Sequence, residues 1–157
     1  MRKLGLLFAA LALAAWAQSP KTGKLPSLTG TWTLVLEKSD FGTIPPPKSV
    51  VNVIEHKEPF ITVESVMELP QGQYKATLKY RTTGAQDDND SYGTGMTTWS
   101  KWLGNEFVIE GEVIAKEKWV RFRERWSLAD GGKTLINNRV IIMANGEVPQ
   151  KLVFARK

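Results

Sequence analysis

Apolar and polar residues alternate along most of the chain after Leu28, in runs rich in Val, Ile, Thr, Trp, Tyr and Phe. Alternation with a period of two is typical of strands that bury one face, and no stretch there shows a convincing helical period. Each run ends in a turn signal. The pattern predicts strands over residues 31–38, 49–56, 59–69, 73–83, 94–103, 106–115, 118–128, 133–144 and 147–157.

Tight turns separate several of these runs and set the predicted topology. The turn sequences are Gln71-Gly72, Gly104-Asn105, Asp130-Gly131-Gly132 and Asn145-Gly146. Such residues adopt the positive φ angles of tight hairpins, so successive strands should be antiparallel neighbours. A large meander avoids exposed edges most simply by closing on itself. The prediction is an all-β domain, a single antiparallel up-and-down β-barrel of about 8 to 9 strands, with a β-sandwich as the alternative.

Two longer connections interrupt the tight turns. Residues 41–48 include Pro45-Pro46-Pro47, which should run as a stiff extended segment because proline fixes φ and has no N–H for a strand ladder. Residues 84–93 are polar and acidic, and we expect them to form a mobile loop at one mouth of the barrel.

Hairpin pairing determines which side chains share a face of the sheet. Around Gln71-Gly72, Tyr74 and Tyr80 fall on the apolar face, opposite the basic residues of the same run. The inner face around Gly104-Asn105 combines small with large residues. These are Thr98, Ser100 and Gly111, beside Trp102 and Phe107. Small inward residues leave volume unfilled, which predicts an apolar cavity unless bulky neighbours such as Trp126 or Phe154 fill it.

One acidic side chain, Glu124, falls on the apolar face of residues 118–128 beside Phe122, and Arg139 falls on the apolar face of residues 133–144. A buried charge is costly unless it is paired, so we predict that Glu124 lies near Arg139. Such a pair either fixes the register of the two strands or provides a polar anchor on the cavity floor.

The leading functional hypothesis is a binding protein that holds a small, largely apolar molecule in the barrel lumen. The predicted ligand-binding residues are Tyr74, Tyr80, Trp102, Phe107, Phe122, Glu124, Arg139 and Phe154. A second hypothesis is an interaction module whose outer patch of Trp99, Trp119 and Phe60 binds a protein or an envelope polymer. A third is an enzyme that uses Glu124 with Tyr80 in the lumen.

Residues 1–17 have the features of a cleaved signal peptide. Arg2 and Lys3 give a positive start, residues 4–15 are apolar, and Ala15-Trp16-Ala17 offers the small residues that signal peptidase requires. The apolar run is shorter than the roughly 20 residues of a membrane-spanning helix, so we expect cleavage and no stable membrane insertion. The protein is predicted to be exported, to a periplasm or to the extracellular space.

Cleavage after Ala17 leaves 140 of the 157 residues, the size of one domain. Without Arg2 and Lys3, 19 of the 21 basic residues remain against 16 acidic ones, and a net charge of +3 is too small to imply a nucleic-acid partner. The chain has no cysteine, and His56 is its one histidine. This excludes disulfides and the usual zinc, copper and thiol chemistry, so we expect no metal, cofactor or enzymatic activity.

A family resemblance begins at Gly30-Thr31-Trp32, which looks like the Gly-x-Trp opening of lipocalins and fatty-acid-binding proteins. In those barrels the tryptophan plugs the closed end, and residues 25–28 resemble the segment that crosses it. The resemblance implies a lipocalin-like (calycin) domain over residues 30–157, preceded by residues 18–29 across the barrel end. Residues 151–157 resemble the closing strand, and Arg156 or Arg139 would lie across the tryptophan face.

Other segments resemble a group of uncharacterised exported bacterial lipocalin-like proteins. They are residues 37–42, 54–57, 126–128 with 130–135, and 150–154. Two features depart from the fatty-acid-binding proteins, whose first strand is followed by a helical lid and whose closing strand carries an Arg-x-Tyr carboxylate clamp. Residues 41–48 carry three prolines where that lid would begin, and Val153-Phe154-Ala155-Arg156 has no counterpart of the clamp.

Overall fold

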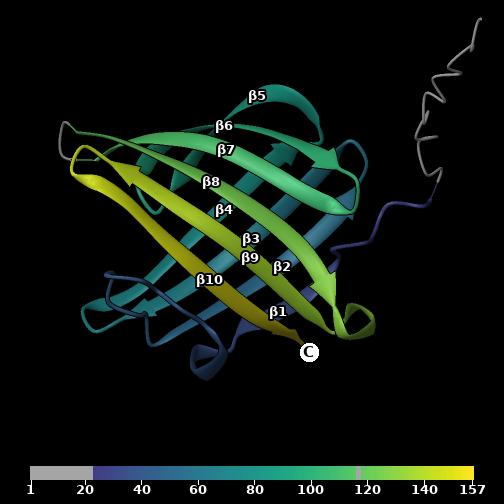
Figure 1. Cartoon of the computed structure of the whole chain (residues 1–157), viewed down its shortest axis with the longest axis horizontal. Helices are drawn as coiled ribbons and strands as arrows, with labels where there is room; N and C mark the ends of the chain where they lie inside the picture. The colour runs from purple at the N-terminus through teal and green to yellow at the C-terminus, as the bar shows by residue number, and fades with distance from the viewer. Residues whose placement is uncertain (1–22, 116–117) are drawn as a thin grey trace, which may run out of the picture.

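The computed structural model describes residues 23–115 and 118–157, and the predicted signal peptide lies outside them. Within these residues the chain forms ten strands and two short 3-10 helices (Figure 1). The strands are β1 (Gly30–Leu34), β2 (Ser49–Lys57), β3 (Phe60–Leu69), β4 (Gly72–Arg81), β5 (Thr83–Ser91), β6 (Thr94–Leu103), β7 (Glu106–Ala115), β8 (Lys118–Ala129), β9 (Thr134–Met143) and β10 (Gly146–Arg156). The 3-10 helices are η1 (Leu36–Lys38) and η2 (Asp130–Gly132).

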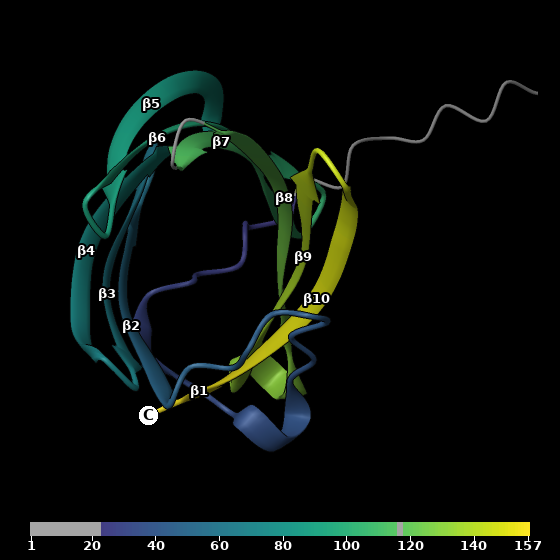
Figure 2. The same ribbon diagram turned by 90° about the vertical axis from the view of Figure 1, so that its left-hand side faces the viewer.

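All ten strands belong to one antiparallel sheet in the order β4-β3-β2-β1-β10-β9-β8-β7-β6-β5. Except for β4 and β5, strands that follow each other in sequence pair with each other, and β1 also pairs with β10, where Trp32 lies opposite Arg156. The sheet wraps round until β4 and β5 lie side by side, which gives the nearly closed barrel seen end-on in Figure 2. The predicted antiparallel barrel is confirmed, and it has ten strands where the sequence predicted eight or nine.

The additional strand is β5. The sequence predicts a mobile acidic loop over residues 84–93, and this prediction is wrong because most of that segment pairs with β6. Toward β4, side chains replace the missing backbone ladder. Asp87 Oδ2 accepts a hydrogen bond from the Arg81 amide at 2.6 Å, and Asn89 Oδ1 accepts one from the Lys79 amide at 2.7 Å. The polar residues that suggested a loop therefore connect the two edges of the sheet.

The first strand is shorter than predicted. It ends at Leu34, and the last three of the predicted residues 31–38 form η1 instead. The chain then returns to β10, where Asp40 and Lys151 form an isolated bridge. Ser39 Oγ donates to the carbonyl of Val35 at 2.8 Å and fixes this turn. The prediction of strand beyond Leu34 is therefore wrong.

One end of the barrel is closed by the segment before β1, which crosses it on the far side in Figure 2. Leu28 and Trp32 are fully buried there, and Trp32 Nε1 donates to the Leu28 carbonyl at 2.8 Å. The Arg156 guanidinium lies 4.5 Å from the Trp32 ring centroid, a favourable cation–π contact. Of the two arginines that the resemblance left open, Arg156 is the one that covers the tryptophan, and Arg139 is not.

The predicted hairpin registers are confirmed, because Ile61 lies opposite Tyr80 and Trp102 lies opposite Phe107. Inside the barrel, Tyr80, Phe107 and Trp126 contact one another edge to face, with ring centroids 5.9–6.1 Å apart. Edge-to-face packing of this kind stabilises the core beyond the burial of the rings themselves. This aromatic cluster and the closed end form the packed part of the core, and a cavity lies toward the other end.

Candidate ligand-binding site

The other end of the barrel contains a cavity of about 740 Å³. Its rim includes Pro45 and Pro46 of the β1–β2 loop and Gln71 of the β3–β4 turn, which are all exposed, so the cavity opens to solvent there. Inward-facing apolar side chains from every strand except β5 line it further down. They include Leu34, Val50, Val63, Leu78, Val113, Val120, Ile141 and Leu152. The cavity has the size and lining of a small-molecule site.

The loop at the rim is held against β10. Gln150 Nε2 donates to the Phe41 carbonyl at 2.9 Å, and Asp40 Oδ1 accepts from the Gly42 amide at 2.9 Å. Gly42 has φ of +60°, and a Cβ there would lie 2.8 Å from the Pro149 carbonyl oxygen. Only glycine fits this close approach without a shift of backbone. The position of Gly42 against β10 thus fixes the start of the proline-containing segment at the cavity entrance.

A polar cluster occupies one wall of the cavity. Glu124 on β8 lies opposite Arg139 on β9, and Arg139 Nε donates to Glu124 Oε1 at 2.7 Å. The other carboxylate oxygen accepts from Trp126 Nε1 at 2.7 Å and from Asn137 Nδ2 at 2.8 Å. Glu124 is only 5% exposed. The predicted pair of Glu124 and Arg139 is therefore confirmed, with a buried carboxylate whose two oxygens are both hydrogen-bonded.

Tyr80 lies next to this cluster, and its side chain is almost completely buried. Burial raises the pKa of Tyr80 far above its ordinary value, and the Glu124 carboxylate raises this pKa further. The phenol therefore keeps its proton, and Tyr80 lines the cavity as an uncharged side chain. Nearer the rim, Ser65 and Tyr92 share a hydrogen bond of 2.7 Å between their hydroxyl groups. Polar groups thus stand at several places in a wall that is mainly apolar.

The structure brings five of the eight predicted ligand-binding residues to the cavity. These are Tyr80, Phe122, Glu124, Arg139 and Phe154. They come from β4, β8, β9 and β10, which converge because neighbouring strands in the barrel present the same face inward. Whether these residues bind a ligand stays a prediction.

Tyr74, Trp102 and Phe107 are not among the residues that line the cavity. Trp102 lies near the closed end, where its ring is 5.3 Å from Phe107 and 5.6 Å from His56. Phe107 is fully buried in the aromatic cluster, and Tyr74 is half-buried near the β3–β4 turn. Hairpin pairing gives the face on which a side chain lies but not its height in the barrel, which is why Trp102 and Phe107 were predicted to contact a ligand.

The small inward residues do not create the cavity. Phe122 covers Gly111, where an added Cβ would lie 2.2 Å from the Phe122 Cζ atom. Ser100 is buried, and its hydroxyl donates to the Arg81 carbonyl at 2.8 Å. Thr98 is also fully buried, so the volume beside these small residues is occupied. The predicted cavity exists, but it lies toward the open end, and the filling residue at Gly111 is Phe122 and not Trp126 or Phe154.

Several residues that line the cavity were not predicted from the sequence. They are Ile44, Pro45, Pro46 and Pro47 of the rim, Ser65 and Tyr92 of the upper wall, and Asn52, Trp126, Asn137 and Gln150 further in. The rim prolines belong to a loop whose path depends on its attachment to β10. Asn137 and Gln150 do share the inward face of their hairpin with Arg139, and that alternation was the one available signal.

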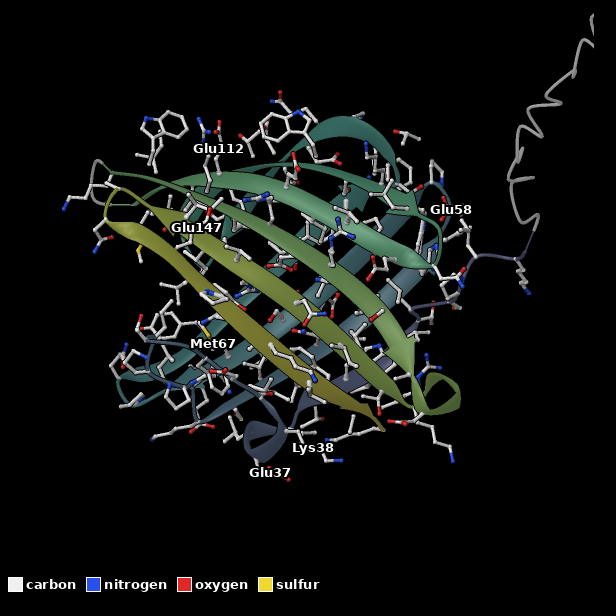
Figure 3. All side chains as sticks on the ribbon, in the orientation of Figure 1. Glu37, Lys38, Glu58, Met67, Glu112 and Glu147 are labelled. Atoms are coloured by element: carbon white, nitrogen blue, oxygen red, sulfur yellow. The ribbon has the colours of Figure 1, made fainter. Side chains whose placement is uncertain are left out.

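A second polar cluster surrounds the single histidine near the closed end, and Figure 3 shows its Glu58 far from the Met67 of the cavity. Glu58 Oε1 lies 2.7 Å from His56 Nε2 and accepts from Trp102 Nε1 at 3.0 Å, while its other oxygen accepts from Thr82. Although partial burial acts to raise the pKa of Glu58, these hydrogen bonds outweigh burial and lower it. Among the described residues, no three His, Asp or Glu side chains are grouped to hold a metal ion.

The outer face over β6, β7 and β8 exposes two tryptophans. Trp99 is 38% exposed and Trp119 is 59% exposed. Phe60, the third residue of the predicted outer patch, lies on β3, and the ammonium group of Lys79 covers its ring at 4.1 Å. Two strands separate β3 from β6 in the barrel, so Phe60 does not extend the surface around the tryptophans. None of the described helices is long and apolar enough to span a membrane.

Comparison with known proteins finds no matching family model and no match among curated proteins. Solved structures do match. An abundant heat-soluble (SAHS) protein from Ramazzottius varieornatus has a TM-score of 0.62 at 15% identity, over 88% of this chain and all of that one. Zebrafish ileal bile acid-binding protein, complexed with cholic acid, has a TM-score of 0.60 at 14% identity, over 82% of this chain and 98% of that one.

The wild-type fluorescent protein UnaG also matches, with a TM-score of 0.56 at 17% identity over 83% of this chain and 97% of that one. These likenesses, together with the nearly closed ten-stranded barrel, define the fold as that of the calycins, the class that includes the lipocalin-like barrels. The similarity is one of fold. Membership of the exported bacterial group that the sequence resembles stays a prediction.

Proposed function

We propose that this protein binds a small, largely apolar molecule inside its barrel. The observation that carries the proposal is the cavity of about 740 Å³, which opens at the proline-containing rim and has the Glu124–Arg139 pair in its wall. Side chains on the cavity wall such as Leu78, Val113 and Val120 face inward but remain only half-buried. An apolar ligand would remove that surface from water, and this burial favours binding.

The structural neighbours support the proposal. Zebrafish ileal bile acid-binding protein was crystallised with cholic acid, and a fatty-acid-binding protein from Manduca sexta has a TM-score of 0.51 at 15% identity. Both are barrels of the same fold whose names state a small amphipathic ligand. We further propose, from the features of residues 1–17, that binding takes place after export, in a periplasm or outside the cell.

The experiment uses N-phenyl-1-naphthylamine, an uncharged apolar dye whose fluorescence rises in an apolar environment. The wild-type chain without residues 1–17 is titrated beside a Val113→Phe/Val120→Phe variant. Val113 and Val120 lie opposite each other on β7 and β8 and both line the cavity. Two added rings occupy the cavity, so we expect saturable dye binding to the wild type and at least about tenfold weaker binding to the variant.

The matched control is Val53→Phe/Ile114→Phe, which places the same two rings at exposed positions, 46% and 52% accessible. Binding to this control should equal that of the wild type. Equal dye binding by the cavity variant would contradict the proposal and would favour the outer face around Trp99 and Trp119 as the binding surface. Circular dichroism spectra of all three proteins establish that each is folded.

A further inference from the structure

The cavity contains one acidic and one basic side chain among its described lining residues, and these two are paired with each other. Glu124 and Arg139 lie opposite in the β8–β9 ladder, and both Nε and Nη2 of Arg139 lie 2.7 Å from Glu124 Oε1. All other described lining residues are uncharged at neutral pH. The wall therefore presents no net charge to a ligand.

Glu124 has no remaining capacity for a ligand. Its four contacts are two from Arg139, one from Trp126 and one from Asn137, which match the roughly four acceptor sites of a carboxylate. The Glu124 side chain is 7% exposed, whereas that of Arg139 is 33% exposed. Arg139 is thus the more accessible partner of the ion pair, and the Glu124 carboxylate is shielded.

Arg139 retains donors for a ligand. A guanidinium group has five N–H bonds, and Arg139 makes no side-chain contact other than that with Glu124 within residues 23–115 and 118–157. An uncharged oxygen of a ligand is able to accept from the remaining N–H groups at little desolvation cost. A ligand carboxylate loses its hydration in the same place and also faces the negative charge of Glu124, which offsets its attraction to Arg139.

We infer that the cavity selects apolar ligands whose polar end is an uncharged oxygen, as in a long-chain alcohol, and that Glu124 is the residue that excludes the corresponding carboxylate. The inference rests on the proposed function, because it concerns the ligand of the same cavity. Glu124 acts here as a specificity-determining residue without touching the ligand, since its charge cancels that of the arginine that does.

The test compares 1-dodecanol with dodecanoate as competitors for bound N-phenyl-1-naphthylamine at pH 8. The wild type should prefer the alcohol. Any apolar cavity shares that preference for the alcohol. The decisive variant is therefore Glu124→Gln, which leaves the positive charge of Arg139 without a neighbouring negative charge. Relative to dodecanol, dodecanoate should bind this variant at least about tenfold better than it binds the wild type.

Glu112→Gln is the matched control, because Glu112 lies outside the cavity on β7, 4.0 Å from Arg121, and its replacement changes the net charge by the same amount. Figure 3 shows Glu112 on the outer surface. This control should keep the wild-type ratio of the two competitors. An unchanged ratio in Glu124→Gln, or an equal shift in Glu112→Gln, would overturn the inference while dye binding itself leaves the proposed function standing.

Absence of dye binding by the wild type would instead contradict the proposed function and this inference together. If Glu124→Gln does not fold, Arg139→Gln and the double variant Glu124→Gln/Arg139→Gln make the same comparison. Dodecanoate should bind Arg139→Gln, which keeps the unpaired carboxylate, more weakly than it binds the uncharged double variant. Equal binding of dodecanoate to these two proteins would overturn the inference.

Discussion

Asn89 replaces a missing strand neighbour for Lys79. Its Oδ1 accepts from the Lys79 amide at 2.7 Å, and its Nδ2 donates to the Lys79 carbonyl at 3.0 Å. A single side chain on β5 thus makes both hydrogen bonds that a paired residue would make with the β4 backbone. Asp87 acts similarly at Arg81, where it accepts from the amide and from Nε. Side chains therefore complete the barrel where its ladder stops.

The first prediction concerns this seam between β4 and β5. Asn89→Leu keeps the size of the side chain but removes both hydrogen bonds to Lys79. Hydrogen exchange of the Lys79 amide should accelerate about fivefold, as expected for a hydrogen bond worth about 1 kcal/mol.

Two controls accompany the exchange measurement. The amide of Leu78 points toward β3 by strand alternation and should keep its exchange rate. The substitution Asn138→Leu, at an exposed residue of β9, should leave Lys79 protected. Unchanged Lys79 exchange in Asn89→Leu would show that the side-chain bridge does not hold the seam.

The second prediction concerns the contact between Gly111 and Phe122. Gly111→Ala forces a Cβ into the Phe122 ring and should lower the free energy of unfolding by about 1–3 kcal/mol. In a Phe122→Leu background the ring is gone, and the same substitution should be neutral or stabilising because alanine is the better strand residue. Urea denaturation of the four proteins gives this cycle, and equal losses in both backgrounds would contradict the close packing.

The third prediction concerns Glu58 and pH. Hydrogen bonds lower the pKa of Glu58 in the folded state, so its contribution to stability is fully present above the ordinary value of 4.5 and is lost as the pH falls through the folded-state pKa. The stability difference between the wild type and Glu58→Gln should therefore shrink with acidification.

Thermal unfolding across this pH range measures the difference, with Glu55→Gln, at an exposed residue of β2, as the control that should show a smaller change. Because the Glu58 side chain is 45% exposed, the effect is expected to be small. If the stability difference between the wild type and Glu58→Gln does not change with pH, the hydrogen bonds to Glu58 do not have the role assigned to them.

The sequence predicted nine of the ten strands because turn residues and alternation are local signals. β5 was missed because its residues, from Thr83 to Ser91, include neither Val, Ile, Leu nor an aromatic residue. β5 is extended because of contacts outside the strand itself. The side chains of Asp87 and Asn89 accept hydrogen bonds from backbone amides of β4. The polar side chains that suggested a solvated loop therefore close the barrel.

The candidate site, like the fold, was predicted only in part. Pairing across β8 and β9 placed Glu124 with Arg139 correctly, since that contact follows from strand register. The height of each side chain in the barrel does not follow from register, and Trp102 and Phe107 consequently belong to the filled end. The rim depends on contacts far apart in sequence, such as that of Gln150 with Phe41.

The most direct test of ligand binding inside the barrel follows the methionine methyl groups by NMR. Met67 and Met96 line the cavity, whereas Met143 does not. In protein labelled with ¹³C at the methionine methyl groups, N-phenyl-1-naphthylamine should shift the Met67 and Met96 signals in a saturable manner and leave Met143 largely unchanged. Saturable dye binding with no shift at Met67 or Met96 would contradict the central claim that the ligand lies inside the barrel.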